Sequence, residues 1–411
     1  MINYDIVIIG GGPAGMAAAV AAYDAGVTSV TILEREGDIG GILRQCIHNG
    51  FGLHKLGREL TGPEYAAVYK EKVLERGIPV YYETTVTKIT PEKLVTAQNR
   101  EGILKIQAKA VILAMGCRER SRGALNISGT RPSGVFSAGT AQKLINCEGY
   151  MVGKKAVILG SGDIGLIMAR RMSLEGAKVE AVCELMPYSG GLKRNIVQCL
   201  EDFDIPLYLS TTVCEIHGRE RLEGVTIAQV DEKRQVIEES KRFIACDTLL
   251  LSVGLIPENE LTRATGIPID PITNGALVDE TCQTQLPGIF ACGNVLQVHD
   301  LVDYVSEEAE RAGLGAVSYV RGEQASAAIV ETKAGNGVRY VLPQQVHTGG
   351  EVDLYLRVTQ PFGKCLFTVR SGEKVLTTAK RLLASPGEME RLTVNTEHVT
   401  EPITVTLEEQ A

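Results

Sequence analysis

The sequence has no two cysteines spaced as CxxC and no Cys/His cluster at metal-ligand spacing. Its ten cysteines are scattered along the chain, at positions 46, 117, 147, 183, 199, 214, 246, 282, 292 and 365. This distribution argues against a bound metal. We expect most of these thiols to be reduced and to serve as small core residues.

Long apolar runs are also missing, since no stretch approaches the roughly 20 residues that a membrane-spanning helix needs. An apolar strand begins within three residues of the first methionine, which leaves no room for a secretory signal. We therefore expect a cytoplasmic protein without a transmembrane segment. No Ser/His/Asp arrangement and no pair of carboxylates points to hydrolysis.

Basic residues are fewer than acidic residues. The chain has 42 basic and 50 acidic residues and a formal charge of −8, which argues against a nucleic-acid partner. Its 411 residues, 44% hydrophobic and 22% charged, are the composition of an ordinary folded protein with two or three domains.

The first chemical motif is a nucleotide-binding βαβ unit near the start. The apolar run 6–9 predicts a strand, which ends in Gly10, Gly12 and Gly15 before a segment with helical spacing. In such units the first glycine permits a tight turn, the second lets the backbone approach a pyrophosphate, and the third lets the helix pack closely on the strand. Glu34 ends the next strand, where an acid accepts hydrogen bonds from a ribose.

A second unit repeats the first. The run 155–159 leads into Gly160, Gly162 and Gly165, and Glu184 ends the strand that follows. In both copies the acid lies 24 positions after the first glycine (34 − 10 and 184 − 160). This repeated spacing indicates two dinucleotide-binding units. The chain is therefore expected to be an α/β protein with two Rossmann-like domains.

The rest of the first 325 residues fits this class. We expect a helix over 61–76, a strand over 80–89, a hairpin edge at 104–108, a buried strand at 110–116 and a helix over 302–314. From about Ser326 the apolar residues alternate with period two, as in Val352, Leu354 and Leu356. This pattern predicts a small antiparallel β domain with one buried face.

These residues resemble flavoproteins of the pyridine nucleotide-disulfide oxidoreductase superfamily that are built like the low-molecular-weight thioredoxin reductases. The resemblance covers residues 1–325 and rests on the two fingerprints, the Gly40-Gly41 loop, the strand that ends at 114–116, and the segment 288–294. The segments 41–52 and 300–309 look most like flavoproteins encoded beside an FAD-dependent glycerol-3-phosphate dehydrogenase, and like the small flavin subunits of opine oxidase, hydroxyproline dehydrogenase and hydrogen cyanide synthase.

The resemblance implies an NAD domain inserted in an FAD domain. The expected boundaries are 1–118 and 285–325 for the FAD domain, 119–284 for the NAD domain and 326–411 for the C-terminal β domain. The expected FAD contacts are Gly10, Gly12, Pro13, Ala14, Gly15, Glu34, Arg35, Gly41, Gln45, Val86, Ala114, Gly116, Gly293, Asn294 and Glu307. The expected NAD contacts are Gly160, Gly162, Asp163, Ile164, Gly165, Glu184 and Gly254.

Two of these expected contacts are open to alternatives. The family usually has Gly-Asp where this chain has Gly293-Asn294, and the amide keeps an acceptor for the flavin ribityl chain but loses the charge. Glu184 favours NAD over NADP, because an acid repels a 2′-phosphate, although Lys193 and Arg194 could receive one.

Around the flavin face, Cys46 and His48 are the candidate catalytic residues. Cys46 could attack a disulfide or a peroxide as a thiolate, or merely pack under the flavin. His48 could donate protons or serve as a hydrogen-bonded spacer. His299 is expected in a solvated loop, and Glu307, Glu308 and Glu310 in the acidic first turn of a helix, whose backbone rather than carboxylates would face the flavin.

The predicted function is an oxidoreductase that moves electrons between NAD(H), FAD and a partner redox subunit or small acceptor, in a glycerol-3-phosphate or amino or hydroxy acid dehydrogenase system. The alternatives are a single-cysteine disulfide or peroxide reductase at Cys46 and a non-catalytic flavin subunit of a larger dehydrogenase. The absence of a CxxC argues against thioredoxin reduction, because thioredoxin reductases carry this motif in the NAD domain. We expect a homo- or hetero-oligomer in which the C-terminal domain docks a partner or a second copy, or else covers the FAD domain.

Overall fold

The computed structural model describes residues 2–323 and 327–410, and the chain divides into two compact units. The first unit comprises residues 1–117 and 257–411, and the second comprises residues 118–256. The second unit therefore ends earlier than the expected boundary at Thr284. The reason is that Ile267, Ala276 and Val278 pack into the core of the first unit.

A mixed sheet forms the centre of the first unit, with its strands in the order β5-β2-β1-β8-β7-β6 and β20 paired with β8. Strands β1, β2, β5, β8 and β20 run parallel, and β7 and β6 continue the sheet antiparallel. The bounds are β1 Ile2–Ile9, β2 Val30–Leu33, β5 Val80–Tyr81, β6 Thr85–Ile89, β7 Leu94–Asn99, β8 Gly102–Leu113 and β20 Ile289–Ala291. The four residues of β2 and the last four of β1 are all buried, as expected for parallel strands covered on both faces.

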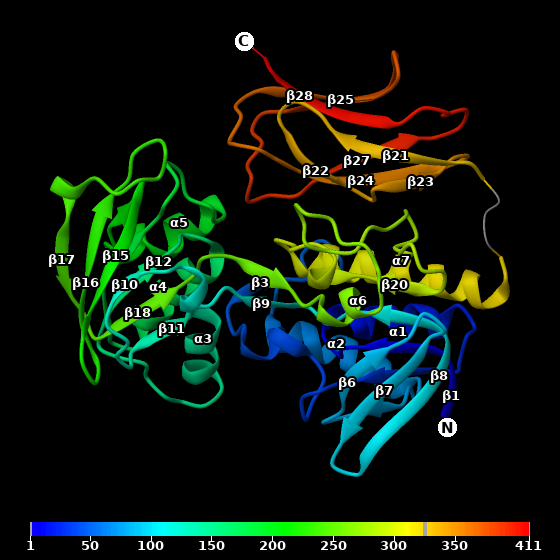
Figure 1. Cartoon of the computed structure of the whole chain (residues 1–411), viewed down its shortest axis with the longest axis horizontal. Helices are drawn as coiled ribbons and strands as arrows, with labels where there is room; N and C mark the ends of the chain where they lie inside the picture. Colours follow the sequence, from blue (N-terminus) through cyan, green and yellow to red (C-terminus); the bar gives the residue numbers. More distant parts are fainter. Residues whose placement is uncertain (1, 324–326, 411) are drawn as a thin grey trace. The chain divides into compact units, whose positions relative to one another are not determined.

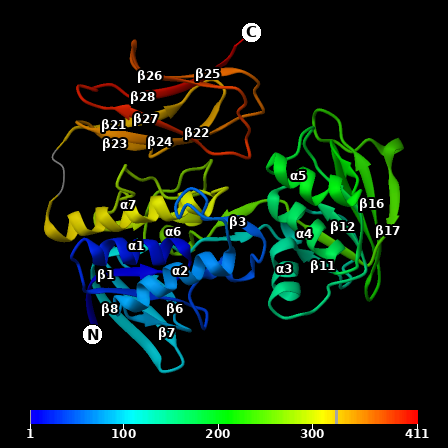
Figure 2. The ribbon, with the colours of Figure 1, turned by 180° about the vertical axis from the view of Figure 1, so that it is seen from behind.

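Three helices cover one face of this sheet: α1 (Pro13–Asp24), α2 (Gly62–Glu75) and α7 (Val302–Arg321). Figures 1 and 2 show α1 and α7 side by side although they are far apart in sequence. The two helices can approach closely because Gly313 lies against the Ala18 carbonyl oxygen, 2.6 Å from where a Cβ would stand. Helix α2 begins with a capping box in which Thr61 and Glu64 bond each other's backbone N–H.

Several expected elements differ in extent. The expected strand 80–89 is divided into β5 and β6, because Glu83 between them has a left-handed backbone with φ 47°. The expected hairpin edge and buried strand are one strand, β8, which pairs with β7 over its first half and with β1 over its second. Helix α7 continues to Arg321, beyond the expected end at Leu314.

The second unit has a five-stranded parallel sheet in the order β11-β18-β12-β13-β14 and a second sheet in the order β10-β15-β16-β17. Figure 1 shows α3, α4 and α5 with the first of these sheets. The strands of these two sheets are β10 Ser128–Gly129, β11 Val135–Ser137, β12 Lys155–Leu159, β13 Lys178–Cys183, β14 Leu207–Tyr208, β15 Thr211–Gly218, β16 Leu222–Gln229, β17 Arg242–Ala245 and β18 Thr248–Leu251. Two further strands, β9 Cys117–Glu119 and β19 Leu255–Pro257, pair with each other where the chain enters and leaves this unit. Its helices are α3 Ala138–Asn146, α4 Asp163–Leu174 and α5 Lys193–Cys199, and a further short helix, α6 Glu260–Ala264, belongs to the first unit.

After residue 326 the chain forms two packed sheets, which we call the C-terminal module (327–410). One sheet has the order β23-β21-β28-β25-β26 and the other β22-β24-β27. The expected alternation is confirmed, since Val352, Leu354 and Leu356 are all buried in the core between the sheets. One parallel pair, β21 with β28, interrupts the antiparallel pattern. The bounds are β21 Ile329–Ala334, β22 Val338–Leu342, β23 Gln345–His347, β24 Glu351–Val358, β25 Cys365–Ser371, β26 Lys374–Arg381, β27 Glu390–Asn395 and β28 Ile403–Glu409.

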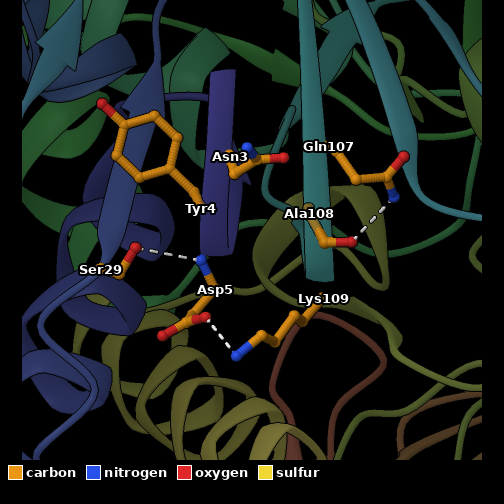
Figure 3. A pocket seen from close by; sticks show the side chains of 7 residues that line it. All are labelled: Asn3, Tyr4, Asp5, Ser29, Gln107, Ala108 and Lys109. Carbon is orange, nitrogen blue, oxygen red and sulfur yellow. Dashed lines mark hydrogen bonds and ion pairs between the residues drawn. The ribbon is translucent and has the colours of Figure 1, made fainter. Parts of the chain in front are cut away.

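A pocket of about 310 Å³ lies at the amino end of β1 and is shown in Figure 3. Asp5 forms an ion pair with Lys109 at 2.8 Å, and its backbone N–H donates to Ser29. Tyr4 and Asp5 stand near the beginning of the strand that leads to Gly10, so this pocket lies at the end of β1 away from the glycine turn. Within the described ranges, no helix combines the length and apolar character needed to cross a bilayer.

Candidate functional site

The glycine turn after β1 has the geometry of a phosphate loop. Gly10 has φ +105°, and a Cβ on it would lie 2.4 Å from the Ala114 carbonyl oxygen. A Cβ on Gly15 would lie 1.8 Å from the Gly10 carbonyl oxygen. Both positions therefore require glycine for the fold itself.

Gly12 is different, because the fold does not require it. Its backbone has φ −71°, which any residue adopts, and a Cβ there would meet no atom within 4 Å. The open space lies at the N-terminus of α1, whose first turn carries no acidic side chain. Free helix N–H groups and an uncrowded backbone are what a pyrophosphate needs, so this position fits a dinucleotide.

The second unit repeats these features. Gly160 has φ +100°, and its Cβ would stand 2.0 Å from the Ser252 carbonyl oxygen. A Cβ on Gly165 would lie 2.6 Å from the Gly160 carbonyl oxygen, whereas a Cβ on Gly162 would meet nothing nearer than 3.8 Å. The first and third glycines are again structural, and the second again leaves room.

The two acids also make matching hydrogen bonds. Glu34, 6% exposed, accepts the Gly11 N–H at 2.6 Å and the Glu36 N–H at 2.7 Å. Glu184 accepts the Ser161 N–H at 2.8 Å and the Met186 N–H at 2.9 Å. Each carboxylate thus fixes its glycine loop and keeps lone pairs that could accept ribose hydroxyls.

The repeat extends further than the two fingerprints that the sequence pattern predicted. Gly190-Gly191 follows Glu184 as Gly40-Gly41 follows Glu34, and every matched pair is 150 positions apart (160 − 10, 184 − 34 and 190 − 40). Both glycine pairs lie against their glycine turns, since the Gly40 N–H donates to the Gly11 carbonyl and the Gly190 N–H to Ser161 Oγ. The constant offset was the signal that could have revealed the second pair.

The structure brings most of the expected FAD contacts together at the carboxyl ends of β1, β2, β8 and β20. A Cβ on Gly293 would lie 2.7 Å from the Ala14 side chain, and a Cβ on Gly41 would lie 3.0 Å from the Gly12 Cα. Pro13 is the first residue of α1. The carboxyl ends of parallel strands are where α/β folds bind ligands.

The remaining expected FAD contacts have other surroundings. Arg35 is exposed, Gln45 and Val86 are buried, and Gly116 has φ +70° and would meet nothing within 4 Å if it carried a Cβ. Glu307 faces Arg391 of the C-terminal module, with 3.6 Å between Oε2 and Nη1. Their contacts with FAD stay predictions.

Cys46 and His48 lie in the loop that follows Gly41. Cys46 Sγ donates to the Ile42 carbonyl at 3.3 Å, and the His48 ring lies 5.0 Å from the Phe51 ring. The catalytic roles of the two residues stay predictions.

Most of the other thiols are confirmed as core residues. All ten cysteines are unbridged, and six are buried. Burial raises the pKa of Cys183, Cys246 and Cys282 to about 12, so these thiols stay protonated and unreactive. Within the described residues, no group of His, Cys, Asp and Glu is placed to hold a metal ion.

Two expectations about the start of α7 were wrong. Because the helix begins at Val302, Glu307, Glu308 and Glu310 lie beyond its first turn, which carries Asp303 instead. His299 is not solvated: its side chain is 2% exposed and its Nε2 lies 3.4 Å from Glu308 Oε2. The sequence suggested a solvated loop because a histidine between polar residues normally faces water, whereas here His299 lies against Glu308 and Asn294.

In the second unit, the Asp163 side chain forms hydrogen bonds within the protein, and its contact with NAD stays a prediction. Its Oδ1 accepts the Leu192 N–H at 2.8 Å and Asn195 Nδ2 at 2.7 Å, so it holds the loop that carries Gly190 and Gly191. Ile164 lies in the first turn of α4, and Gly254, with φ +103°, follows Ser252, whose carbonyl lies against Gly160. Their contacts with NAD stay predictions.

Comparisons with known proteins agree with this geometry. A subunit of alkyl hydroperoxide reductase from Pseudomonas aeruginosa is 27% identical over 303 residues, 72% of this chain and 54% of the relative. A subunit of opine oxidase from Agrobacterium tumefaciens is 24% identical over 321 residues, 71% of this chain and 61% of the relative. This chain thus spans little more than half the length of these two relatives.

Among solved structures, thioredoxin reductase of T. acidophilum superposes with a TM-score of 0.63 at 24% identity, over 77% of this chain and 99% of that one. This likeness shows the fold. The sequence pattern of a pyridine nucleotide family matches residues 4–332, which include both glycine turns. The chain therefore belongs to the pyridine nucleotide-disulphide oxidoreductases, a family of oxidoreductases that use FAD and a nicotinamide dinucleotide.

Proposed function

We propose that this chain is an FAD-dependent NAD(H) oxidoreductase that passes electrons between a nicotinamide cofactor, FAD and a partner redox subunit or small acceptor. The observation that carries the proposal is the repeated phosphate loop. Gly12 and Gly162 both leave open space beside a helix N-terminus, and Glu34 and Glu184 make the same pair of backbone hydrogen bonds. Two such loops account for two dinucleotides.

In the first unit, FAD would be held by the glycine turn, by Glu34 at its adenosine ribose, and by the segment at Gly293. When bound, FAD supplies the hydride and electron chemistry that no protein side chain offers. The chain's own part is to bind and orient it. The α1 N–H groups neutralise phosphate charge, and the rigid packing of Gly293 against Ala14 fixes the turn that borders the cofactor.

In the second unit, the proposed ligand is NAD(H) in preference to NADP(H). Glu184 directly follows β13, and its carboxylate would face a 2′-phosphate at short range. Such a like-charge contact costs roughly 1–3 kcal/mol after screening. Lys193 and Arg194 are exposed on the following helix and are the residues that could reverse the preference.

A protein partner is proposed because several relatives, such as the one from opine oxidase, are named as subunits. The partner in this proposal is a dehydrogenase or redox subunit of a glycerol-3-phosphate or amino or hydroxy acid dehydrogenase system. The chain lacks the CxxC that would reduce a disulfide by dithiol exchange. Electrons would therefore leave the flavin directly rather than through a cysteine pair.

Anaerobic titration of the purified full chain tests the proposal. We expect bound FAD, bleaching of the flavin absorbance by NADH, and reduction at least about tenfold slower with NADPH, the rate ratio that 1.4 kcal/mol produces. The two reduction rates are measured by stopped flow under argon. A folded protein that takes up no FAD contradicts the proposal.

The same titration separates the two alternatives. A long-wavelength charge-transfer band in the half-reduced protein would favour a Cys46 reductase. FAD that is bound but not reduced by either nucleotide would favour a non-catalytic flavin subunit. Equal rates with NADH and NADPH would leave the oxidoreductase in place but assign the nucleotide choice to Lys193 and Arg194.

A further inference from the structure

A buried carboxylate joins the proposed flavin segment to α7. Glu308 is 2% exposed, and its Oε1 accepts the Gly293 N–H at 2.7 Å. Its Oε2 accepts Gln297 Nε2 at 2.8 Å and lies 3.4 Å from His299 Nε2. Burial alone would raise the pKa of Glu308, but the charge and hydrogen bond of His299 hold it below its ordinary value, so the carboxylate is ionised.

The neighbouring residue, Asn294, is held by the same group. Its Oδ1 accepts the His299 backbone N–H at 3.0 Å and lies 3.3 Å from His299 Nδ1. Its Nδ2 donates to Cys117 Sγ at 3.6 Å. Both ends of this amide are engaged inside the protein, so His299 and Glu308 together fix the conformation of the Gly293-Asn294 turn.

The C-terminal module contacts Gln297, which is hydrogen-bonded to Glu308. The Tyr340 hydroxyl, on β22, donates to Gln297 Oε1 at 3.2 Å, and both side chains are buried. From β24, Arg357 Nη2 donates to the Val298 carbonyl at 3.0 Å. The module therefore contacts the segment that directly follows Asn294.

The Tyr340 hydroxyl and the Glu308 carboxylate hold opposite ends of the Gln297 amide in one orientation. While Oε1 accepts from Tyr340, Nε2 must face Glu308 and donate to it. Without the hydroxyl, the buried Gln297 Oε1 loses its donor, and only the Glu308 carboxylate still holds the amide, so Gln297 is less firmly fixed. Glu308 would then have a less firmly held donor at Oε2, and its position at the Gly293 N–H would be less strictly set.

We propose that Tyr340 and Gln297 are positioning residues for the flavin, through which the C-terminal module sets the Gly293-Asn294 turn without touching the cofactor. The inference rests on the proposed function, because it takes this turn to border FAD. Its consequence is that flavin affinity and reduction potential depend on a hydroxyl in another sheet.

The test compares Tyr340→Phe with Tyr355→Phe in the full chain. Tyr355 is a matched control, since it is also a buried tyrosine of the module, but its hydroxyl accepts from Arg311 on α7 and not from the 297–300 segment. The dissociation constant of FAD is measured by reconstituting the flavin-free protein, and the two-electron potential by dye equilibration. We expect Tyr340→Phe to weaken FAD binding about fivefold, the usual effect of one buried hydrogen bond, and to shift the potential, and we expect Tyr355→Phe to change neither.

A double variant tests the route. Because the hydroxyl acts through Gln297, Gln297→Met combined with Tyr340→Phe should lose no more affinity than Gln297→Met alone. Wild-type affinity and potential in Tyr340→Phe, or an equal shift in Tyr355→Phe, would overturn the inference while leaving the proposed function intact. If the unaltered chain binds no FAD, both are overturned.

Discussion

Gly12 and Gly15 are three positions apart, yet alanine should have opposite effects at the two sites. At Gly12 a methyl group meets no protein atom, so the free energy of unfolding of flavin-free Gly12→Ala should lie within about 1 kcal/mol of the unaltered chain. The same methyl occupies the space that a pyrophosphate would approach. FAD affinity should therefore fall at least about tenfold, or about 1.4 kcal/mol.

Gly15→Ala is the contrasting variant. Its Cβ would lie 1.8 Å from the Gly10 carbonyl oxygen, so the turn cannot form without displacing β1 or α1. We expect this variant to be unfolded or destabilised by several kcal/mol, of the order seen for severe overpacking. Urea unfolding and flavin titration of both variants check the pair, and a Gly12→Ala protein that binds FAD normally would show that the ligand does not approach there.

Which site residues could be predicted depended on how local their partners are. Gly10, Gly15 and Glu34 were predicted because turn, strand and acid follow one another at fixed spacing. His299 and Glu308 were misjudged because polar residues in a loop and an acid-rich helix normally face water. Contacts with the neighbouring residues Gly293, Asn294 and Gln297 hold them in the interior, and no fixed spacing in the sequence marks this arrangement.

At the scale of elements, α4 begins with an acid whose role is to hold a loop. Asp163→Ala removes the acceptor for the Leu192 N–H and for Asn195, which frees the loop that carries Gly190. We expect the KM for NADH to rise about fivefold, with kcat little changed, because ground-state binding is what is lost. Steady-state dye reduction measures both constants.

Asp163→Asn keeps the oxygen acceptor and is the matched control. If the carboxylate acts through these hydrogen bonds, the asparagine variant should stay near the unaltered KM. If both variants behave alike, the charge at the start of α4, and not the loop, affects nucleotide binding.

Element type was easier to predict than element extent. The alternation of β-branched residues in 80–89 predicted one strand. The positive φ at Glu83 divides this segment into two strands, and the sequence gives no sign of it because no glycine stands there. The first half of β8 is partly exposed and its second half is fully buried, a change that suggests two strands. The structure has one continuous strand, whose first half belongs to the hairpin with β7 and whose second half lies in the centre of the sheet. Chain-wide pairing, not propensity, sets these boundaries.

At the scale of the whole chain, the C-terminal module is part of the first unit's core. Tyr340 and Leu342 pack among residues of the central sheet, and Arg357 bonds Val298. A chain that ends at Glu323 should therefore lose FAD and unfold at lower urea concentration. Flavin content, NADH-to-dye activity and mass in solution are measured together on the truncated and full chains.

The other outcome would favour the docking role expected from the sequence. In that case the truncated chain keeps FAD and dye activity, and changes only its mass or its binding to a partner chain. Sequence reasoning could place a β module here from its period-two pattern. It could not tell docking from covering, because the contacts that decide the question join residues 297–311 to residues 340–391.

Because the offset is constant at 150 positions, each residue of the first phosphate loop can be compared directly with one residue of the second. If the two halves descend from one duplicated ancestor, insertions and deletions have left no net change between the matched phosphate loops. Differences at matched positions, such as Gly11 against Ser161 or Pro13 against Asp163, then record divergence from a common starting loop. Variants in which the two residues of such a pair are exchanged would show which substitutions adapted one loop to a flavin nucleotide and the other to a nicotinamide nucleotide.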